Sequence, residues 1–591
     1  MKFKAILPFF AFLLLGATFL AAQKRTFTIS GYIEDAETGE KLIAANVFDK
    51  KAGQGAVSNT YGFYSLSLSK DSVFLNISYI GYQTQDVRLK LDKDIALNFK
   101  LQPSLTLKEV EITAEKAERI EEQTQMSKIT VPIELIKKVP TLMGEVDVLK
   151  TLQLLPGVQS GGEGQTGLYV RGGSPDQNLI LLDGVPVYNV SHLLGFFSVF
   201  NADAIKNVTL IKGGFPARYG GRLSSIIDIT MKEGNNKKIK GEGSIGLIAS
   251  KFTIEGPIWK DKTSFLISAR RTYLDLIFKP LVQKVNANSG STDKIDLQLY
   301  FYDLNAKINH KINDKHRLYL SAYSGLDILG TSITSSQRAG DYDKTKSGTD
   351  WGNLTSAFRW NYQVSPRLFA NTTLTYSRYG FNIGASQESK TNSNIETFSF
   401  AYRSGIQDWA GKIDVDYIPN PNHYIRAGLS SIFHTYTPGA VQFKAKLDQF
   451  QIDTLLGSKK TAAKEYDYYV EDDARFGALK VNYGLHGALF NVEGVYYPSL
   501  QPRLGVNYLL SNSVAVKGAF STMTQYINLL TNESLSLPTD LWVPSTKRIK
   551  PQTSWQVAAG VAKTFADKYE VSIEGYYKAM NNVLSYKPGA S

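Results

Sequence analysis

The sequence predicts a mainly β protein with a small N-terminal β-sandwich, a compact α+β unit and a large antiparallel sheet that spans a membrane. Tyr (33) and Phe (30) far outnumber Trp (6) and Met (6), and 48 Gly accompany many Thr, Ser and Asn, as is typical of strands and turns. Beyond residue 240, apolar and polar residues alternate over long segments. Short polar turns and long polar connections follow one another there, the pattern of outer-membrane sheets.

Residues 1–22 predict a secretory signal peptide. Met1-Lys-Phe-Lys4 is basic, residues 5–22 carry no charge, and the run ends in Ala21-Ala22. A retained single-span anchor is the alternative, because about 18 apolar residues can nearly cross a bilayer. No later apolar run is as long, so a chain that enters the membrane again must cross it with strands.

Composition and spacing argue against several function classes. The chain has no Cys, which excludes disulfides, thiolate metal sites and cysteine nucleophiles. The net charge is +12, but Lys and Arg are scattered among acidic residues, so we expect no nucleic-acid partner. The six His show neither metal-ligand spacing nor a nucleophile beside them. The glycines at 162–167 fit a nucleotide-binding pattern, but a strand follows them where such a site needs a helix. We therefore expect no enzyme activity, no metal and no cofactor.

Residues 26–102 predict a self-contained β unit. Strands are expected at 27–33, 59–66 and 73–82, at roughly ten-residue spacing and separated by Gly and Asp turns. Short strands in this arrangement favour a β-sandwich.

Residues 130–233 predict a compact α+β unit. Val146, Leu149, Leu152 and Leu155 share one helical face, and Pro156-Gly157 should end that helix. Leu179–Leu182 and Val185–Val187 flank Asp183-Gly184, which predicts a tight hairpin because its turn needs positive φ. One helical turn is expected at 202–207, before a strand at 208–212.

Residues 239–591 predict the membrane sheet. In 571–579, apolar and polar residues alternate, so one face meets lipid and the other meets water. Short turns are expected at 313–315, 365–366, 419–422, 511–513 and 566–568, and long loops at 327–350 and 441–464. About fifteen strands fit into this region.

Three motifs of the α+β unit resemble the plug motifs of TonB-dependent outer-membrane receptors. They are Tyr169-Val-Arg-Gly-Gly173, Leu182-Asp-Gly-Val-Pro-Val-Tyr188 and Ile211-Lys-Gly-Gly-Phe-Pro-Ala-Arg-Tyr-Gly-Gly-Arg222. Residues 26–102 are similar to the carboxypeptidase regulatory-like domain that often precedes the plug. The resemblance implies a plug domain at 130–233 and a transmembrane β-barrel at 239–591. Barrels of this family close with 22 strands, so about 15 strands imply an incomplete barrel in a C-terminally truncated fragment.

The stretch Leu105-Thr-Leu-Lys-Glu-Val-Glu-Ile-Thr-Ala114 resembles the energy-coupling segment of these receptors, which places a TonB box region at 105–116. An exposed β-prone segment there can pair with a partner by strand addition. The alternative is that this segment forms the last strand of the preceding domain. The candidate box residues are Leu107, Glu109, Val110, Ile112, Thr113 and Ala114.

The plug motifs supply the other candidate site residues. We expect Arg171 to form an ion pair with an acidic residue on the barrel wall; the alternative is that it is a simple exposed arginine. We expect the glycines to permit tight turns or close packing. The residues are Arg171, Gly172, Gly173, Asp183, Gly184, Gly213, Gly214, Tyr219, Gly220 and Gly221. Residues 192–200 form either buried plug core, which we favour, or a ligand-contacting apex. Tyr342 and Tyr436 are candidate ligand contacts in outer loops.

The resemblance implies TonB-dependent active import of a scarce nutrient, an iron chelate, vitamin, glycan or peptide, across the outer membrane. Its implied partners are the TonB-ExbB-ExbD inner-membrane complex, outer-membrane lipid and the nutrient ligand. A surface lipoprotein partner is a weaker implication, because Leu179-Ile-Leu-Leu-Asp-Gly-Val-Pro departs from the wording of the starch-importer subfamily. A signal-transducing receptor and a passive adhesin or structural barrel are the alternatives. The plug and N-terminal domain are expected to face the barrel lumen and the periplasm.

Overall fold

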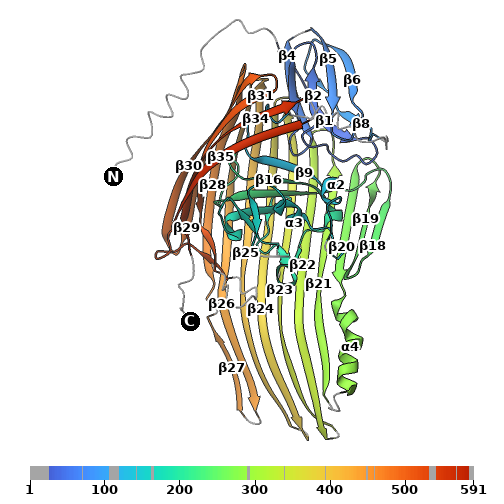
Figure 1. The fold of residues 1–591 in the computed structure, drawn as a ribbon, viewed down its shortest axis with the longest axis vertical. Helices are drawn as coiled ribbons and strands as arrows, with labels where there is room; N and C mark the ends of the chain where they lie inside the picture. Colours follow the sequence, from blue (N-terminus) through green and yellow to red (C-terminus); the bar gives the residue numbers. More distant parts are fainter. Residues whose placement is uncertain are drawn as a thin grey trace.

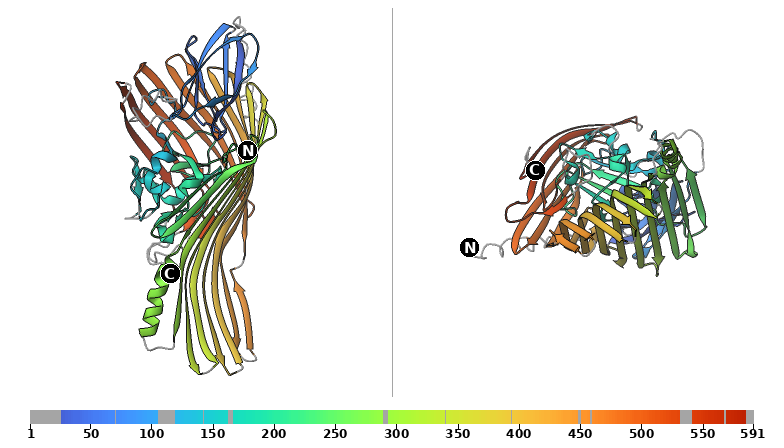
Figure 2. Two further views of the ribbon diagram at one scale, coloured as in Figure 1. Left: turned by 90° about the vertical axis from the view of Figure 1, so that its right-hand side faces the viewer. Right: turned by 90° about the horizontal axis from the view of Figure 1, so that it is seen from below.

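The computed structural model describes residues 26–104 and 119–584, except 70, 142, 162–165, 289–292, 339, 393, 448–449, 458, 531–540 and 567–568. The predicted signal peptide and the candidate box residues 107–114 lie outside the described residues. Three bodies are visible: a sandwich at one end, a tall curved sheet, and a smaller α+β body packed on the sheet's concave face (Figure 1; Figure 2).

The N-terminal body is a sandwich of two four-stranded sheets, as predicted. In the first sheet β1 pairs antiparallel with β4 and parallel with β7 and β8. In the second the order is β3-β2-β5-β6. Ile29, Leu66 and Leu75 are among the residues buried between the sheets. The strands are β1 (Thr26–Asp35), β2 (Asn46–Asp49), β3 (Gln54–Val57), β4 (Phe63–Ser69), β5 (Asp71–Ser78), β6 (Gln85–Leu91), β7 (Ile95–Ala96) and β8 (Phe99–Leu101).

The α+β body is built on a five-stranded sheet of order β13-β12-β17-β16-β9. Only β12 and β17 run parallel; the other neighbours are antiparallel. The strands are β9 (Lys128–Pro132), β12 (Asn178–Leu182), β13 (Val185–Pro186), β16 (Ile205–Ile211) and β17 (Ser225–Met231). Two short helices, α2 (Ile133–Ile136) and α3 (Val148–Gln153), and the small pairs β10 (Val158–Ser160) with β11 (Leu168–Val170) and β14 (Ser191–His192) with β15 (Phe197–Ser198) complete it.

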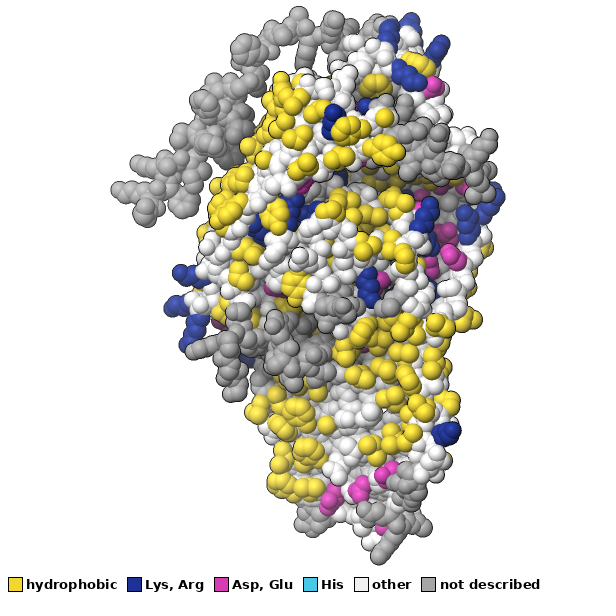
Figure 3. All heavy atoms as spheres, in the orientation of Figure 1, with side chains coloured by type: hydrophobic (Ala, Val, Ile, Leu, Met, Phe, Trp, Pro, Cys, Tyr) yellow, Lys and Arg dark blue, Asp and Glu magenta, His cyan; other side chains and the backbone are white. Residues whose placement is uncertain are grey.

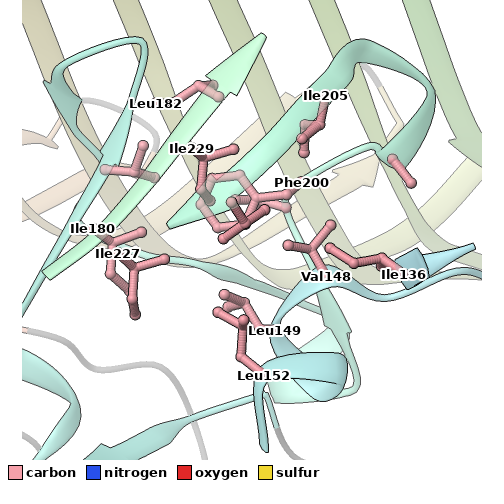
Figure 4. Close-up of a cluster of buried hydrophobic side chains, with 14 of the residues drawn as sticks. Ile136, Val148, Leu149, Leu152, Ile180, Leu182, Phe200, Ile205, Ile227 and Ile229 are labelled. Atoms are coloured by element: carbon pink, nitrogen blue, oxygen red, sulfur yellow. The ribbon is translucent and has the colours of Figure 1, made fainter. Parts of the chain in front are cut away.

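The core of this body joins α3 to the sheet (Figure 4). Leu149 and Leu152 on α3 are buried against Ile227 and Ile229 of β17, with Phe200 beside them. The predicted helical face is therefore confirmed for Leu149 and Leu152, whereas Val146 and Leu155 lie just outside α3 and pack against the same core. Asp147 caps α3, since its side chain accepts a hydrogen bond from the backbone N–H of Lys150.

The large sheet is antiparallel throughout and has 16 strands in the described residues. Fifteen follow one path from β18 to β35, which agrees with the predicted number, and β27 adds to β26. This sheet is a curved wall that is not closed into a cylinder in the described residues, because β18 and β35 lie at its two ends. The strands are β18 (Lys240–Ile245), β19 (Ala249–Trp259), β20 (Thr263–Thr272), β21 (Lys294–Lys311), β22 (His316–Arg338), β23 (Asp341–Ser365), β24 (Leu368–Thr391), β25 (Asn394–Asn420), β26 (His423–Leu447), β27 (Phe450–Leu456), β28 (Thr461–Phe476), β29 (Leu479–Val492), β30 (Val495–Ser511), β31 (Val514–Gln525), β34 (Gln552–Phe565) and β35 (Tyr569–Asn581).

The predicted long loops at 327–350 and 441–464 are wrong. β22 to β26 are 23 to 27 residues long, and 327–350 is instead the paired end of β22 and β23. Residues 441–464 likewise contain the paired ends of β26 and β27. Polar Ser, Thr and Lys suit a strand that is wet on both faces, since cross-strand backbone bonds form whatever the side chains are. The short turns predicted at 313–315, 365–366, 419–422 and 511–513 are confirmed, and most of the one predicted at 566–568 lies outside the described residues.

The two faces of the wall differ as the alternation predicts. On β23, Leu354, Phe358 and Trp360 are exposed on the outer face, whereas Trp351 and Asn353 on the inner face are buried. Figure 3 shows hydrophobic side chains along the left flank, over β30 and β31. An apolar outer face and a polar inner face are what a membrane wall requires.

One helix was not predicted. α4 (Leu274–Asn288) connects β20 to β21 and runs beside β21, away from the sandwich (Figure 1). None of the helices in the described ranges combines the length and the hydropathy needed to cross a membrane.

Candidate functional site

The candidate site is the seat of the α+β body, the polar surface where that body meets the inner face of the wall. Its first contact is made by His192 at the end of β14, which is 1% exposed. The ring Nε2 lies 2.7 Å from an Asp303 oxygen and Nδ1 lies 2.5 Å from an Asp327 oxygen. Burial lowers the pKa of His192, but the two carboxylates outweigh it and raise the pKa to about 9. The protonated ring thus donates to both aspartates at neutral pH.

The wall side of this contact is a network of charges. Arg270 Nη2 lies 2.6 Å from Asp303, and the Tyr323 hydroxyl donates to the same carboxylate at 2.8 Å. Arg270 also donates to the carbonyl of Ser198 on the seated body at 2.8 Å. His192 and Arg270 are the cations beside the buried Asp303 and Asp327, and each aspartate has hydrogen-bonding partners. Arg270 Nη1 also lies 3.8 Å from the buried Glu145, which pairs with Lys251 at 3.3 Å.

The second contact is made by the predicted Asp183-Gly184 turn. Both residues have positive φ, 49° and 81°, so the hairpin prediction is confirmed and glycine suits the second position. One Asp183 oxygen lies 2.8 Å from Lys307 Nζ, and the other accepts from the N–H of Met231 at 2.9 Å. Burial raises the pKa of Asp183, but Lys307 and Arg359 outweigh it, so the pKa lies below its ordinary value.

The third contact is the ion pair expected for Arg171. Its Nη2 lies 3.0 Å from a carboxylate oxygen of Glu574 on β35, and the same nitrogen donates to Ser127 Oγ at 2.5 Å. The guanidinium also lies over the Tyr576 ring, 4.5 Å from its centroid. The alternative of an exposed arginine is wrong, since Arg171 is buried.

The third motif approaches the wall closely at Gly220. A Cβ there would lie 2.4 Å from Nε2 of His486, so any larger residue would force the histidine ring to move. His486 Nδ1 lies 2.9 Å from the Ala217 carbonyl, and Arg503 donates to the Tyr219 carbonyl. The other motif glycines, Gly172, Gly173, Gly213, Gly214 and Gly221, lie in the turns between strands of the seated body.

Two expectations about ligand contacts are corrected. Tyr342 and Tyr436 lie in β23 and β26 rather than in outer loops, and Tyr436 is fully buried in an aromatic cluster. Residues 192–200 are mainly core, as favoured, because Phe197 and Phe200 are buried; only Leu194 and Phe196 at the tip are exposed.

The segment before β9 is clamped to the wall, which the sequence did not indicate. Lys480 Nζ donates to the Glu122 carbonyl at 2.6 Å, and Asn507 donates to the Glu121 carbonyl at 2.7 Å. The Thr564 hydroxyl donates to the Glu121 carboxylate at 2.6 Å. These contacts fix residues 119–123 on the inner faces of β29, β30 and β34.

The sandwich lies across the short-turn end of the wall. Phe63 stacks on Phe369 with centroids 5.1 Å apart, and Asn59 donates to Asp416 at 3.0 Å. Glu34 pairs with Lys41 of the sandwich and with Arg317 of β22. A cavity of about 2220 Å³ lies between the sandwich, the seated body and the wall. Its lining includes Arg218, Asp228, Arg359, Lys412, Asp414 and Tyr61.

The described residues contain no group of three or more His, Asp or Glu placed to hold a metal ion.

Comparison with known families identifies these bodies. Residues 29–112 match the CarboxypepD_reg-like domain, and residues 122–225 match the TonB-dependent Receptor Plug Domain. The chain is a TonB-dependent receptor. The seated body is its plug, the curved sheet is its barrel wall, and the receptor belongs to the outer membrane.

Relatives of the receptor are distant. It is 28% identical over 247 residues to TonB-dependent receptor SusC of Bacteroides thetaiotaomicron, an alignment that covers 40% of this chain and 23% of SusC. It is 29% identical over 225 residues to TonB-dependent receptor P39 of Formosa agariphila, covering 36% of this chain and 20% of P39. The aligned part is thus less than a quarter of either relative.

Two solved structures share the fold. The ferric enterobactin receptor PfeA of Pseudomonas aeruginosa superposes with a TM-score of 0.51 at 14% identity, covering 77% of this chain and 71% of PfeA. FpvA of P. aeruginosa, solved with a pyoverdine–iron complex, gives a TM-score of 0.52 at 12% identity, covering 78% and 64%.

Proposed function

We propose that the receptor actively imports a scarce nutrient across the outer membrane, and that the plug leaves its seat to open the path. The observation that carries this proposal is the polar seat. Arg171, Asp183 and His192 hold the plug through ion pairs and hydrogen bonds. Most residues of the apolar core belong to the plug itself, and smaller apolar contacts, such as Phe197 with Phe301, cross the seat beside the polar ones. Water can replace polar contacts at a small net cost, so a plug held in this way can move as a body.

The energy is proposed to come from the TonB-ExbB-ExbD complex of the inner membrane. The candidate box, 105–116, lies between the sandwich and the plug, and the chain continues through the clamped residues 119–123 into edge strand β9. A partner strand paired with residues 107–114 could therefore pull on the plug through one short segment. In this proposal the sandwich and the short turns face the periplasm, and the long hairpins face outward.

The ligand class is proposed from the ligands of two proteins that share the fold. PfeA is named as a ferric enterobactin receptor and FpvA was solved with pyoverdine–iron, so an iron chelate is the first candidate. Vitamins, glycans and peptides follow. The test compares the growth of cells with and without the receptor on defined iron, vitamin, glycan and peptide sources. The source on which growth depends on the receptor identifies the ligand for the next experiment.

Val110→Pro tests the coupling. Proline removes the N–H that strand addition needs, so we expect ligand binding to be retained and uptake to fall at least tenfold. Val110→Ala keeps that N–H and serves as the matched control, with normal uptake expected. Undiminished accumulation by Val110→Pro cells with equal surface receptor would contradict the coupling role.

Deletion of residues 26–102 separates import from the signalling alternative. Loss of a transcriptional response with normal uptake would favour a signal-transducing receptor, whereas a passive adhesin would show neither energised uptake nor a response. A surface lipoprotein partner stays a prediction, which co-purification from solubilised membranes would test.

A further inference from the structure

A groove of about 440 Å³ crosses the outer face of the wall from β21 to β25, away from the plug seat. The alternation of side chains along the strands shows on which face of the wall the groove lies. On β23 the groove residues Asp350 and Gly352 have the same parity as the exposed Leu354 and Phe358, whereas Arg359 has the opposite parity and contacts the plug. The groove therefore opens outward, towards lipid.

Gly352 and Gly380 line the floor of this groove, and Gly405 continues their row on the next strand. Gly352 is the register partner of Gly380, and Gly380 is the register partner of Gly405. A Cβ would lie 2.2 Å from a backbone oxygen at Gly352 and 2.5 Å from one at Gly405, so packing requires glycine there. A Cβ at Gly380 would meet nothing within 4 Å. Packing does not explain the glycine at 380, but keeping the groove open does.

Two arginines flank this floor. Arg378 on β24 and Arg403 on β25 are exposed, and within the described ranges neither has a hydrogen-bond or ion-pair partner. They lie on opposite sides of the glycine row, about 13 Å apart along the strand direction. The one acid of the groove, Asp350, already accepts a hydrogen bond from Asn382 at 2.8 Å. Both guanidinium groups are thus available to an anion in the groove.

The groove also lies at the edge of the apolar band. Towards the short turns, outward residues on β23 are apolar or aromatic from Leu354 to Tyr362 except Ser356. This stretch is roughly 26 Å long along the strand, which at a tilt of about 40° covers about 20 Å of the roughly 25 Å height of a membrane band. Towards the strand tips, the outward residues include Lys344 and Lys346. The guanidinium groups therefore lie at the level of lipid headgroups. On the orientation given under Proposed function, on which this step rests, that leaflet is the outer one.

We propose that this groove binds the phosphorylated headgroup of an outer-leaflet lipid. Guanidinium groups bind phosphate oxygens through paired, charge-assisted hydrogen bonds, and Arg378 and Arg403 provide two such forks. Tyr302 and Leu326, which are register partners at the β21–β22 end of the groove, contact the first carbons of the acyl chains. The aromatic ring of Tyr302 suits this interfacial depth.

The experiment titrates the detergent-purified receptor with synthetic bis-phosphorylated lipid A and counts bound lipid by native mass spectrometry. The dephosphorylated glycolipid and inorganic phosphate are the comparison arms. We expect Arg378→Gln and Arg403→Gln each to weaken binding at least tenfold. Gly380→Val fills the groove without a backbone clash and should do the same, whereas Lys346→Gln, a charge loss on the same face, should change affinity less than twofold.

Three results would overturn the proposal: equal binding by wild type and the groove variants, equal binding of the dephosphorylated lipid, or displacement of the lipid by millimolar inorganic phosphate. Orientation is checked separately with Lys346→Cys, because the chain has no native cysteine. Labelling of that cysteine on intact cells by a membrane-impermeant maleimide is expected. Absence of labelling would refute the orientation in the proposed function, whereas labelling without lipid binding would refute the groove alone.

Discussion

Replacement of His192 by Gln tests whether the plug seat depends on charge. In the plug, His192 lies between two wall aspartates and has a pKa of about 9, against 6.5 for a free histidine. That difference corresponds to about 3 kcal/mol of stabilisation. Because the pKa is raised by folding, the stabilisation is complete below pH 6.5 and is lost as the pH rises through 9. The glutamine in His192→Gln does not titrate, so this variant should lack the contribution at every pH.

The assay is urea unfolding of the plug in detergent at pH 6, 8 and 10. A dye on Leu154→Cys reports it, because Leu154 is an exposed plug residue and the chain has no native cysteine. The wild-type plug should lose about 3 kcal/mol between pH 6 and pH 10, and the His192→Gln plug should lose little. His316→Gln, a wall histidine that stacks on Tyr362, is the matched control. Parallel pH profiles for wild type and His192→Gln would refute the reasoning.

Three further changes probe the plug with the same assay. Phe200→Ala removes a buried ring from the plug core and should cost about 3–5 kcal/mol; a cost below about 1 kcal/mol would contradict its place there. Gly220→Ala puts a methyl group against His486 and should cost about 1–3 kcal/mol, whereas Gly575→Ala, where a Cβ meets nothing within 4 Å, should be neutral; equal effects would refute the close approach. Asp183→Asn leaves a buried wall lysine without its ion-pair partner and should cost about 3–5 kcal/mol; an unchanged midpoint would show that the pair is not stabilising.

Most of the fold can be predicted from local sequence patterns. The helical face of Leu149 and Leu152 depends on residues close in sequence, and so does the Asp183-Gly184 turn. Strand length did not follow from sequence, because polar residues in a wet strand look like loop residues. The helix α4, with Pro280 inside it, also gave no clear helical signal.

Of the residues that form the site, only those of the plug could be predicted from the sequence. Arg171 and Asp183 were singled out by their motifs, but their wall partners Glu574 and Lys307 are far away in the chain and belong to ordinary alternating strands. The sequence does not distinguish His192 from the other five histidines, because a single polar residue does not reveal the charges that face it. The sequence does not indicate the clamp on residues 119–123 either, since two of its bonds go to backbone carbonyls and the third joins Glu121 to Thr564, which is far away in the chain.

The position of β9 has a mechanical consequence. It is the outermost strand of the plug sheet, and its ladder joins it to β16 alone over five residue pairs. Tension arriving from its N-terminal side would first load the clamp bonds on residues 119–123, and only then this short ladder. Peeling β9 away would leave the four other strands and the α3 contacts intact, so the plug has a detachable outer layer that can yield without loss of its core.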